Sequence, residues 1–424
     1  MMRSPFRPAR GFTLVELLIG VVVATLTMAA AITLLIAQKR AFQGSSADRA
    51  EQEAGRMALE HISDNLRQAA YGIEPPMVFD FGYMANVPMD RAPAGGVPVN
   101  FGGDASGKSG FPCATPVTCR DSIVQPDELA FQYRDPYFNR PLAAATPNSL
   151  TISLLNPITA AAQPLTQPIP AGQVLQVVCY SGDMVWAYVT VSQTVNPAAG
   201  ATVTIPLQAG SNLDYPHQNQ TLTDTCFNSG QAAVFKVNRF HYFVQSYDVN
   251  GNVVPWETPG SRPYLMLDQG LLDANNNAVL NVVAPDVEDL QVSYVVPLAA
   301  AGAQLLGSTP NVQLTNSAGG IDLAPALGPP VYSTPSLSPL RATGYPANIR
   351  AVGVTLVVRS PNPDPNSSDP TVPAAGNRPV SLNGQPGYRR MLFETSVAVP
   401  NMASAAPYFP AIGNGADQLN VGGG

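Results

Sequence analysis

The feature that most constrains this chain is a segment from Phe12 to Ala37 in which Glu16 is the only charged residue. Its 26 residues, at about 1.5 Å per residue in a helix, are enough to cross a bilayer hydrocarbon core of roughly 30 Å. Three arginines precede the segment, and no acidic residue does. Because positively charged flanks stay in the cytoplasm, we expect one membrane-spanning helix and a body that lies outside the cytoplasm.

Glu16 is the anomaly in this segment, because an ionised carboxylate in the hydrocarbon region costs on the order of 3 kcal/mol. A nearby cation would offset that cost. Cleavage between Gly11 and Phe12 would supply one, since the new α-amino group lies four residues before Glu16. The same amine would be present on every neighbouring copy. We therefore predict that Glu16 pairs with a free amino terminus when subunits pack together.

The run GFTLVELLI that begins at Gly11 resembles the processing site of type IV prepilins. The resemblance implies that a prepilin peptidase cuts after Gly11 and methylates the amino group of Phe12. It also implies that Glu16 pairs with the amine of an adjacent subunit and so sets the axial register of packing. Residues 1–11 would then be a cleaved leader.

Two other interpretations fit parts of this segment. A secretory signal peptide has the same basic start and apolar middle, and the small residues around 27–31 suit an ordinary signal peptidase. An uncleaved signal anchor fits the length. The apolar run is too long for a signal peptide, and neither interpretation explains Glu16. The prepilin interpretation is therefore favoured.

The helix is expected to continue beyond the membrane. No proline occurs between Pro8 and Pro75, so a helix that begins at Phe12 can run to about Tyr71. Apolar residues recur at four-residue spacing in its second half, at Ala54, Ala58, Ile62, Leu66 and Ala70. This stripe predicts docking on a globular head. Gly44 and Gly55 are interpreted as points of bending or local melting, or as merely tolerated.

The composition of the rest favours strands. Charged residues make up only 12% of the chain, while it holds 42 prolines and 35 glycines, which suits β-strands joined by many turns. Strands are predicted at 150–155, 174–180, 184–192, 201–207, 233–244, 287–294, 349–360 and 388–399. The segment 248–252 is interpreted as a hairpin turn rather than a calcium loop, and 324–347 and 361–387 as exposed loops. The expected fold is α+β and pilin-like, with a long N-terminal helix, membrane-spanning in its first half, packed on a large antiparallel β-rich globular head.

Three segments of the C-terminal half carry a second resemblance. They are VEDLQVSY from Val287, IRAVGVTLVVRS from Ile349 and YRRMLFETSVAV from Tyr388, followed by Asn401. In this order they resemble the PilW family of minor pilins of type IV pili. The resemblance covers the N-terminal helix and most of 231–401, but little of 73–230. It divides the chain into a leader at 1–11, a helix at 12–72 that is transmembrane at 12–37, a variable β-rich region at 73–230 and a PilW-like β region at 231–424.

The resemblance also implies a role. A minor pilin is a non-catalytic structural subunit that enters the pilus near its tip, primes assembly, and supports pilus biogenesis, twitching motility and adhesion. Its partners would be the prepilin peptidase, other minor pilins, the major pilin and a tip adhesin. It would reside in the inner membrane with its head in the periplasm, and then in the extracellular pilus. Two alternatives stay open, namely a minor pseudopilin of type II secretion and a membrane-tethered adhesin module.

Four cysteines, Cys113, Cys119, Cys179 and Cys226, lie beyond the membrane segment. In an oxidising compartment they are expected to form two disulfides, for which three pairings exist. We favour pairing Cys113 with Cys119 and Cys179 with Cys226. The spacings lack a CxxC pair and the three histidines are scattered, so no metal site is expected.

Other chemical motifs in the chain lack the context that their chemistry requires. Residues 102–109 match the P-loop pattern, but Gly110-Phe111-Pro112 follows where a helix would have to start. No nucleophile elbow occurs, and His61 is interpreted as an interface or surface residue. Neither an enzyme nor a cofactor is therefore expected. The formal net charge of −7, which becomes −10 once the three leader arginines are removed, disfavours nucleic acid as a partner.

Overall fold

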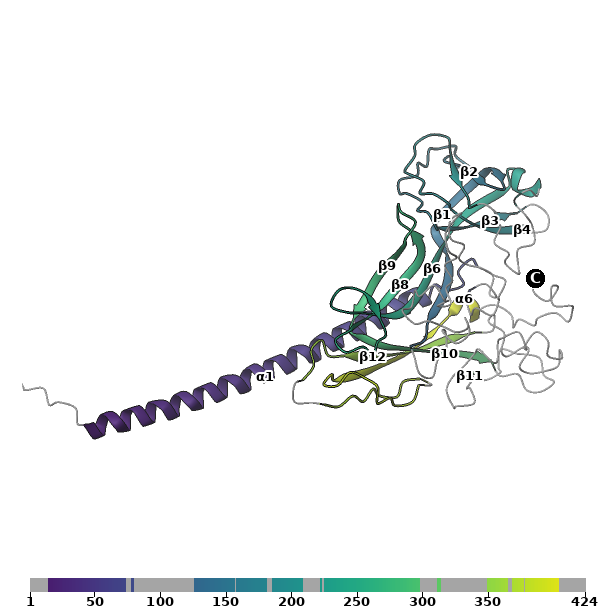
Figure 1. The fold of residues 1–424 in the computed structure, drawn as a ribbon. Helices are drawn as coiled ribbons and strands as arrows, with labels where there is room; N and C mark the ends of the chain where they lie inside the picture. Colours follow the sequence, from purple (N-terminus) through teal and green to yellow (C-terminus); the bar gives the residue numbers. More distant parts are fainter. Residues whose placement is uncertain are drawn as a thin grey trace, which may run out of the picture. The chain divides into compact units, whose positions relative to one another are not determined.

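The computed structural model describes residues 14–73, 78–79, 126–156, 158–180, 185–208, 222, 225–297, 311–313, 349–364, 368–376 and 378–403. The chain divides into two compact units, residues 1–50 and 51–424. Helix α1, Leu14–Leu66, contributes to both units. Nine strands of the second unit form one antiparallel sheet and four more form another (Figure 1).

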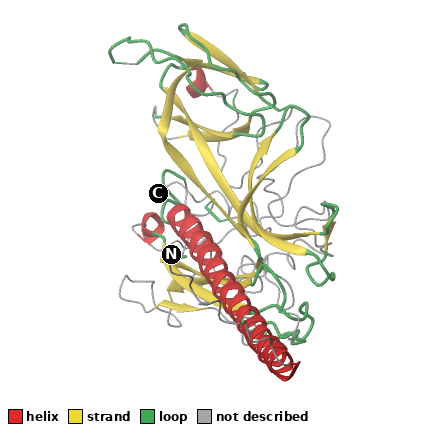
Figure 2. Cartoon of the chain, turned by 90° about the vertical axis from the view of Figure 1, so that its left-hand side faces the viewer, coloured by secondary structure: helices red, strands yellow, loops and turns green. Residues whose placement is uncertain are grey.

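The second half of α1 docks on the head as the apolar stripe predicts. Its stripe residues are buried, namely Ala54, Ala58, Ile62, Leu66 and Ala70. They belong to one apolar core with strands of both sheets, and Figure 2 shows strands beside this part of the helix. The interpretation of Gly55 as a point of local melting is wrong, because α1 is continuous there. A β-carbon at Gly55 would overlap the ring of Phe393. Glycine at 55 permits close packing of helix and sheet.

Helix α1 ends at Leu66, earlier than Tyr71, and residues 67–72 form turns. The difference has a tertiary cause. The backbone N–H of Ala70 donates to the carbonyl oxygen of Gln132 at 3.3 Å, and that of Arg134 donates to Tyr71 at 2.8 Å. Strand β1 thus forms hydrogen bonds with backbone groups that would otherwise be bonded within a longer helix.

The larger sheet has the strand order β4-β3-β6-β1-β2-β5, with β7 and β8 also paired to β6, and β9 paired to β8. Its strands are β1 Leu129–Thr146, β2 Ser149–Ser153, β3 Val174–Cys179, β4 Val185–Thr190, β5 Thr202–Pro206, β6 Ala232–Tyr247, β7 Val253–Val254, β8 Arg262–Leu272 and β9 Ala278–Pro285. Strand β6 follows residue 230 and lies between β3 and β1. Strands from both sides of residue 230 therefore belong to the same sheet.

The upper part of this sheet closes on itself. The chain just after β4 pairs with the chain just after β5, where Val191 forms an antiparallel bridge with Leu207. The N–H of Ser192 donates to the carbonyl oxygen of Pro206, and that of Gln208 to Thr190, both at 3.0 Å. The enclosed side chains alternate along the strands and form a second apolar core. This closed unit lies at the top of Figure 1.

The smaller sheet has the order β11-β10-β12-β13. Its strands are β10 Val287–Pro297, β11 Asn311–Gln313, β12 Ala351–Arg359 and β13 Arg390–Ala398. A 3-10 helix η2, Thr225–Asn228, and a short helix α6, Pro400–Ala403, complete the described elements. The side-chain amide of Asn401 donates to the carbonyl oxygen of Ala69 at 3.0 Å, which ties the chain after β13 to the end of α1.

The fold is α+β, with the long helix packed on antiparallel sheets, which confirms the expected class. All eight predicted strands are present with small shifts of their ends, but β1, β7, β8, β9 and β11 were not predicted. Residues 248–251 do form the expected hairpin turn between β6 and β7. The segment 324–347 lies outside the described residues.

The segment 361–389, which joins β12 to β13, is called the strap from here on. The expectation of an exposed loop at 361–387 is wrong in part. Val372 and Ala375 are buried against Trp256, and Arg378 is buried in an ion pair with Asp289. The composition of the strap could not reveal this, because the residues that it contacts, Trp256 and Asp289, are distant in the sequence.

Candidate assembly and membrane site

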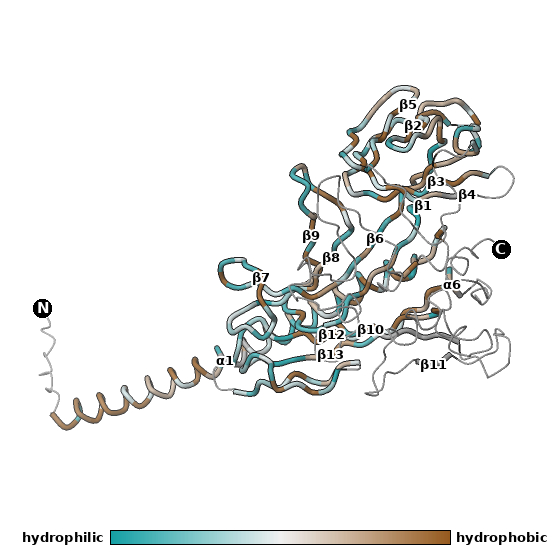
Figure 3. The backbone as a smooth tube through the Cα atoms, turned by 45° about the vertical axis from the view of Figure 1, so that its right-hand side comes forward, coloured by the Kyte–Doolittle hydropathy of each residue, from teal (hydrophilic) through white to brown (hydrophobic). Residues whose placement is uncertain are grey.

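The amino-terminal part of α1 is apolar on all sides. Its exposed large side chains are Leu14, Val15, Leu17, Leu18, Ile19, Val21, Val22, Val23, Leu26, Met28, Ile32, Leu34, Leu35 and Ile36. The most apolar part of the helix is not buried within the structure. Figure 3 shows this part of α1 in brown. By length and composition, α1 can span a membrane.

Hydroxyl groups inside this segment are satisfied by the helix itself. Thr25 Oγ1 donates to the carbonyl oxygen of Val22 at 2.9 Å, and Thr33 Oγ1 donates to Ala30 at 2.8 Å. Such local bonds let a threonine enter a hydrocarbon environment at little cost. Between residues 14 and 37, Glu16 is the only ionisable side chain.

Glu16 lies in the first turn of α1, and its side chain is exposed. A carboxylate at this end interacts favourably with the helix dipole, whose positive end is the amino terminus. An exposed side chain can also reach a neighbouring chain. Gly11 and Phe12 lie outside the described residues, so the cleavage site and the pairing of Glu16 with an amine stay predictions.

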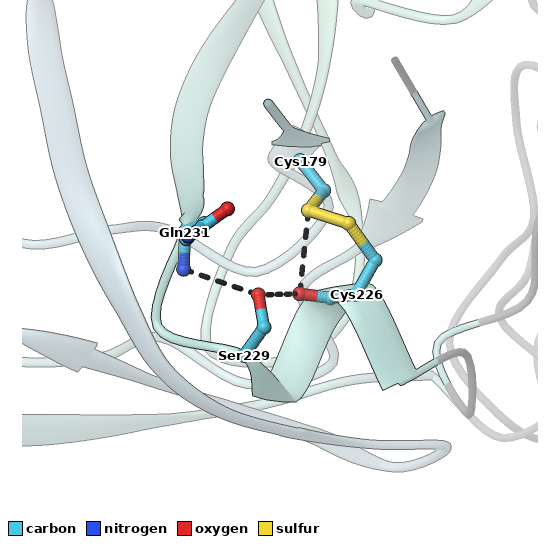
Figure 4. Close-up of a disulfide and its surroundings, with 4 residues drawn as sticks. All are labelled: Cys179, Cys226, Ser229 and Gln231. Carbon is cyan, nitrogen blue, oxygen red and sulfur yellow. Dashed lines mark hydrogen bonds between the residues drawn. A yellow bond between two sulfur atoms is a disulfide. The ribbon is translucent and has the colours of Figure 1, made fainter. Parts of the chain in front are cut away.

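A disulfide joins Cys179, at the end of β3, to Cys226 in η2 (Figure 4). Their Cα atoms are 6.1 Å apart and the residues are 47 positions apart in sequence. Nearby, Ser229 Oγ donates to the carbonyl oxygen of Cys226 at 2.7 Å. A covalent link across such a loop stabilises the fold by about 2–4 kcal/mol. Cys113 and Cys119 lie outside the described residues.

Helix α1 is bound to the head by polar contacts as well as by the stripe. The hydroxyl of Tyr242 on β6 lies 2.9 Å from Nδ1 of His61 and accepts a hydrogen bond of 3.0 Å from the amide of Asn65. Because the hydroxyl accepts from Asn65, it can donate to His61, which favours a neutral imidazole. Burial lowers the pKa of His61, although Asp64 opposes that shift. Burial also raises the pKa of Tyr242.

The head contains a further buried pair on the larger sheet. Nε2 of His241 on β6 lies 2.7 Å from a carboxylate oxygen of Glu128, just before β1. Both side chains are almost fully buried, so the pair stabilises strand packing rather than meeting a substrate. Among the described residues, no group of three or more histidines, cysteines or acidic residues could hold a metal ion.

Sequence reasoning missed most of these contacts. It placed His61 at an interface or surface but did not find its partner Tyr242, and it did not single out Glu128. It also missed the pairing of the neighbouring acidic residues Glu288 and Asp289 with arginines. Charge could have pointed to that pairing, since adjacent charges are unusual in a chain with only 12% charged residues.

The model of the prokaryotic N-terminal methylation motif matches residues 6–32 of the chain. No curated protein and no solved structure matches it. The motif supports a type IV pilin-like or pseudopilin precursor that prepilin peptidase processes. Together with the exposed apolar helix, it is consistent with anchoring in the inner membrane and incorporation into a pilus. Proteins with this motif are structural and not typically enzymes.

Proposed function

We propose that this chain is a PilW-like minor pilin, cut between Gly11 and Phe12, methylated at Phe12 and incorporated near the tip of a type IV pilus. The observation that carries the proposal is the exposed apolar segment 14–36 of α1, whose one carboxylate, Glu16, lies within the matched motif. Such a helix suits a membrane before assembly and a bundle of similar helices afterwards.

Glu16 gives this assembly its register. In a bundle of apolar helices, axial sliding changes little in packing, whereas a charge pair exists in one register only. An unpaired carboxylate in an apolar bundle costs several kcal/mol, so the pairing with the amine of an adjacent subunit favours that register strongly. The chain would thus be matched to subunits with the same processed amino terminus, namely other minor pilins and the major pilin.

The head supports a place near the tip. It contains two sheets, a closed upper unit and the strap, and this bulk would crowd a densely repeated shaft. At the tip it could prime assembly and contact an adhesin. The disulfide between Cys179 and Cys226 suits an oxidising compartment, which supports a periplasmic head before assembly and an extracellular head afterwards. Residues 1–11 would remain behind as leader.

The mature amino terminus tests the proposal most directly. Mass spectrometry of the purified chain should find N-methylated Phe12 as the first residue. Replacement of Gly11 by a bulky residue should leave the full-length precursor in the membrane. An uncut Met1 in the wild-type chain, or a cut near Ala31, would contradict the proposal.

Deletion of the gene separates the pilin from a pseudopilin of type II secretion, which shares the matched motif. Loss of surface pili and of twitching with intact protein secretion is the expected result. Loss of secretion with intact pili would assign the chain to the secretion system. Normal pili and normal secretion, together with an uncut amino terminus, would instead point to a tethered adhesin module.

A further inference from the structure

Three buried carboxylates pair with arginines near the start of β10, and none of these residues belongs to α1. The ion pairs are Arg262 with Asp286, Arg390 with Glu288 and Arg378 with Asp289, at N–O distances of 2.8, 2.5 and 2.7 Å. The three carboxyl-bearing side chains are almost fully buried, with at most 7% of their surface exposed. Each carboxylate therefore already has an arginine of its own.

Arg359, the last residue of β12, is a fourth arginine in this cluster. Glu288 and Asp286 lie near enough to attract its charge, but among the described residues it forms no ion pair with a carboxylate. It is only 2% exposed. Its Nη2 donates to the carbonyl oxygen of Ser261 at 2.5 Å, and its guanidinium lies 4.0 Å from the centre of the Tyr388 ring. Within the described part of the chain, its Nε and Nη1 have no hydrogen-bond partner. A guanidinium stays protonated in proteins, so a buried positive charge and two donor groups need an acceptor.

The surroundings of Arg359 do not supply that acceptor. The side-chain amide of Gln385 donates to Ser261 Oγ at 2.9 Å and to the carbonyl oxygen of Trp256 at 3.1 Å. Ser261 Oγ in turn donates to the carbonyl oxygen of Trp256 at 3.2 Å. The acceptors of this network thus already receive bonds. Trp256 Nε1 is a further buried donor without a partner among the described residues. The network has more donors than acceptors, which is rare inside proteins.

We infer that Arg359 binds a small monovalent anion of the halide class, buried between β12 and the strap. Such an ion carries negative charge, and it accepts hydrogen bonds without adding a donor of its own. The guanidinium needs both. A water molecule would accept hydrogen bonds but would add no negative charge. The nearly complete burial of Nε and Nη1 excludes large anions and polymers. The site is independent of the proposed pilin function, because it uses no residue of the membrane helix.

The bound ion would fasten the strap to the sheet. Gln385 and Tyr388 belong to the strap, whereas Arg359 belongs to β12 and Ser261 lies just before β8. Neutralising Arg359 at this junction removes the electrostatic cost of bringing these elements together. Halide binding should therefore appear as stability of the folded head.

Thermal unfolding of the processed full chain in detergent tests the inference. At equal ionic strength, sodium chloride and sodium bromide should raise the unfolding midpoint by roughly 2–4 °C over sodium gluconate, with a dependence that saturates. Arg359→Met should abolish this difference. Arg262→Met is the matched control, because Arg262 is half-exposed and pairs with Asp286. It should lower the midpoint equally in all salts and keep the halide effect.

Equal midpoints of the wild-type chain in chloride, bromide and gluconate would overturn the inference, as would a halide effect that survives in Arg359→Met. If Arg359→Met fails to fold, a crystal of the wild-type chain grown with sodium bromide decides. An anomalous peak within hydrogen-bonding distance of Arg359 Nε or Nη1 is expected. A water molecule there without anomalous signal, or no density at all, would refute the inference.

Discussion

Residues 14–36 and residues 54–66 belong to the same helix, yet their side chains have different surroundings. In the first region the large apolar side chains are exposed on every side, from Leu14 to Ile36. In the second, one stripe is buried in the head and the other faces carry polar residues. Helical structure alone thus says little about what a segment binds. The distribution of apolar side chains around the axis says more, since an all-round apolar surface suits lipid or similar helices.

The largest expected effect concerns the first region. Glu16→Ala should leave membrane insertion and cleavage intact but abolish incorporation into filaments or minor-pilin complexes, because the charge that fixes the register is lost. Glu16→Gln, of the same size, should fail in the same way if the charge matters. Sheared pilus fractions probed by immunoblot, beside total membrane fractions, measure this. Normal incorporation of either variant would mean that the charge pairing is dispensable.

A matched pair of truncations tests the contrast between the two regions. Ile62→Ala should lower the free energy of unfolding of the head by about 2–5 kcal/mol, because Ile62 is fully buried. Ile32→Ala removes the same atoms from a side chain that is 50% exposed, and should change it by less than about 0.5 kcal/mol. Urea unfolding of the full chain in detergent, followed by tryptophan fluorescence, gives both values. Similar losses of unfolding free energy in the two variants would contradict the difference in burial between the two regions of α1.

Substitution of two glycines of α1 tests the same difference between exposed and buried parts of the helix. Gly55→Ala should destabilise the head by about 1–3 kcal/mol, because the added β-carbon overlaps the Phe393 ring. Gly44→Ala meets no atom within 4 Å and should instead favour the helix by up to about 1 kcal/mol. Thermal unfolding of both variants would show shifts of opposite sign. A stabilised Gly55→Ala would mean that the helix does not press on β13.

The smallest effect is expected from pH. The pKa of His61 is lowered from 6.5 by burial, so the folded head binds this proton less readily than the unfolded chain does. Its stability should be complete above pH 6.5 and fall as the pH drops below that value toward the folded pKa. Because His61 is partly exposed, the loss should stay below about 1 kcal/mol.

His61→Gln isolates this contribution from that of the carboxylates. Unfolding measured between pH 7.5 and 5.5 should show a smaller loss of stability in the variant than in the wild-type chain. Tyr242→Phe removes the hydrogen-bond partner and should cost about 0.5–1.5 kcal/mol at neutral pH. Identical pH profiles of His61→Gln and the wild type would exclude His61 as the titrating group.

Local patterns were sufficient for several features. The unbroken apolar run and the absence of proline predicted helix α1, and the four-residue spacing from Ala54 to Ala70 predicted its buried face. Alternating β-branched residues predicted most strands, including β6 and β12. Strand β1 was not predicted, because residues 135–138, around Pro136, interrupt its alternation of apolar and polar residues. The same residues form an irregularity in its pairing with β6. The candidate site at Glu16 was found because a lone carboxylate in an apolar run is itself a local anomaly.

By itself, the sequence determined the membrane-competent helix, the buried stripe and the α+β class, because each depends on periodicity or composition within a short segment. Tertiary structure alone decided that β6 lies between β3 and β1 and that the upper unit closes through Val191 and Leu207. It also decided that two donor atoms of Arg359 have no hydrogen-bond partner in the described part of the chain. These features join residues far apart in the chain. Their energies depend on burial and on geometry between segments, which no local pattern contains.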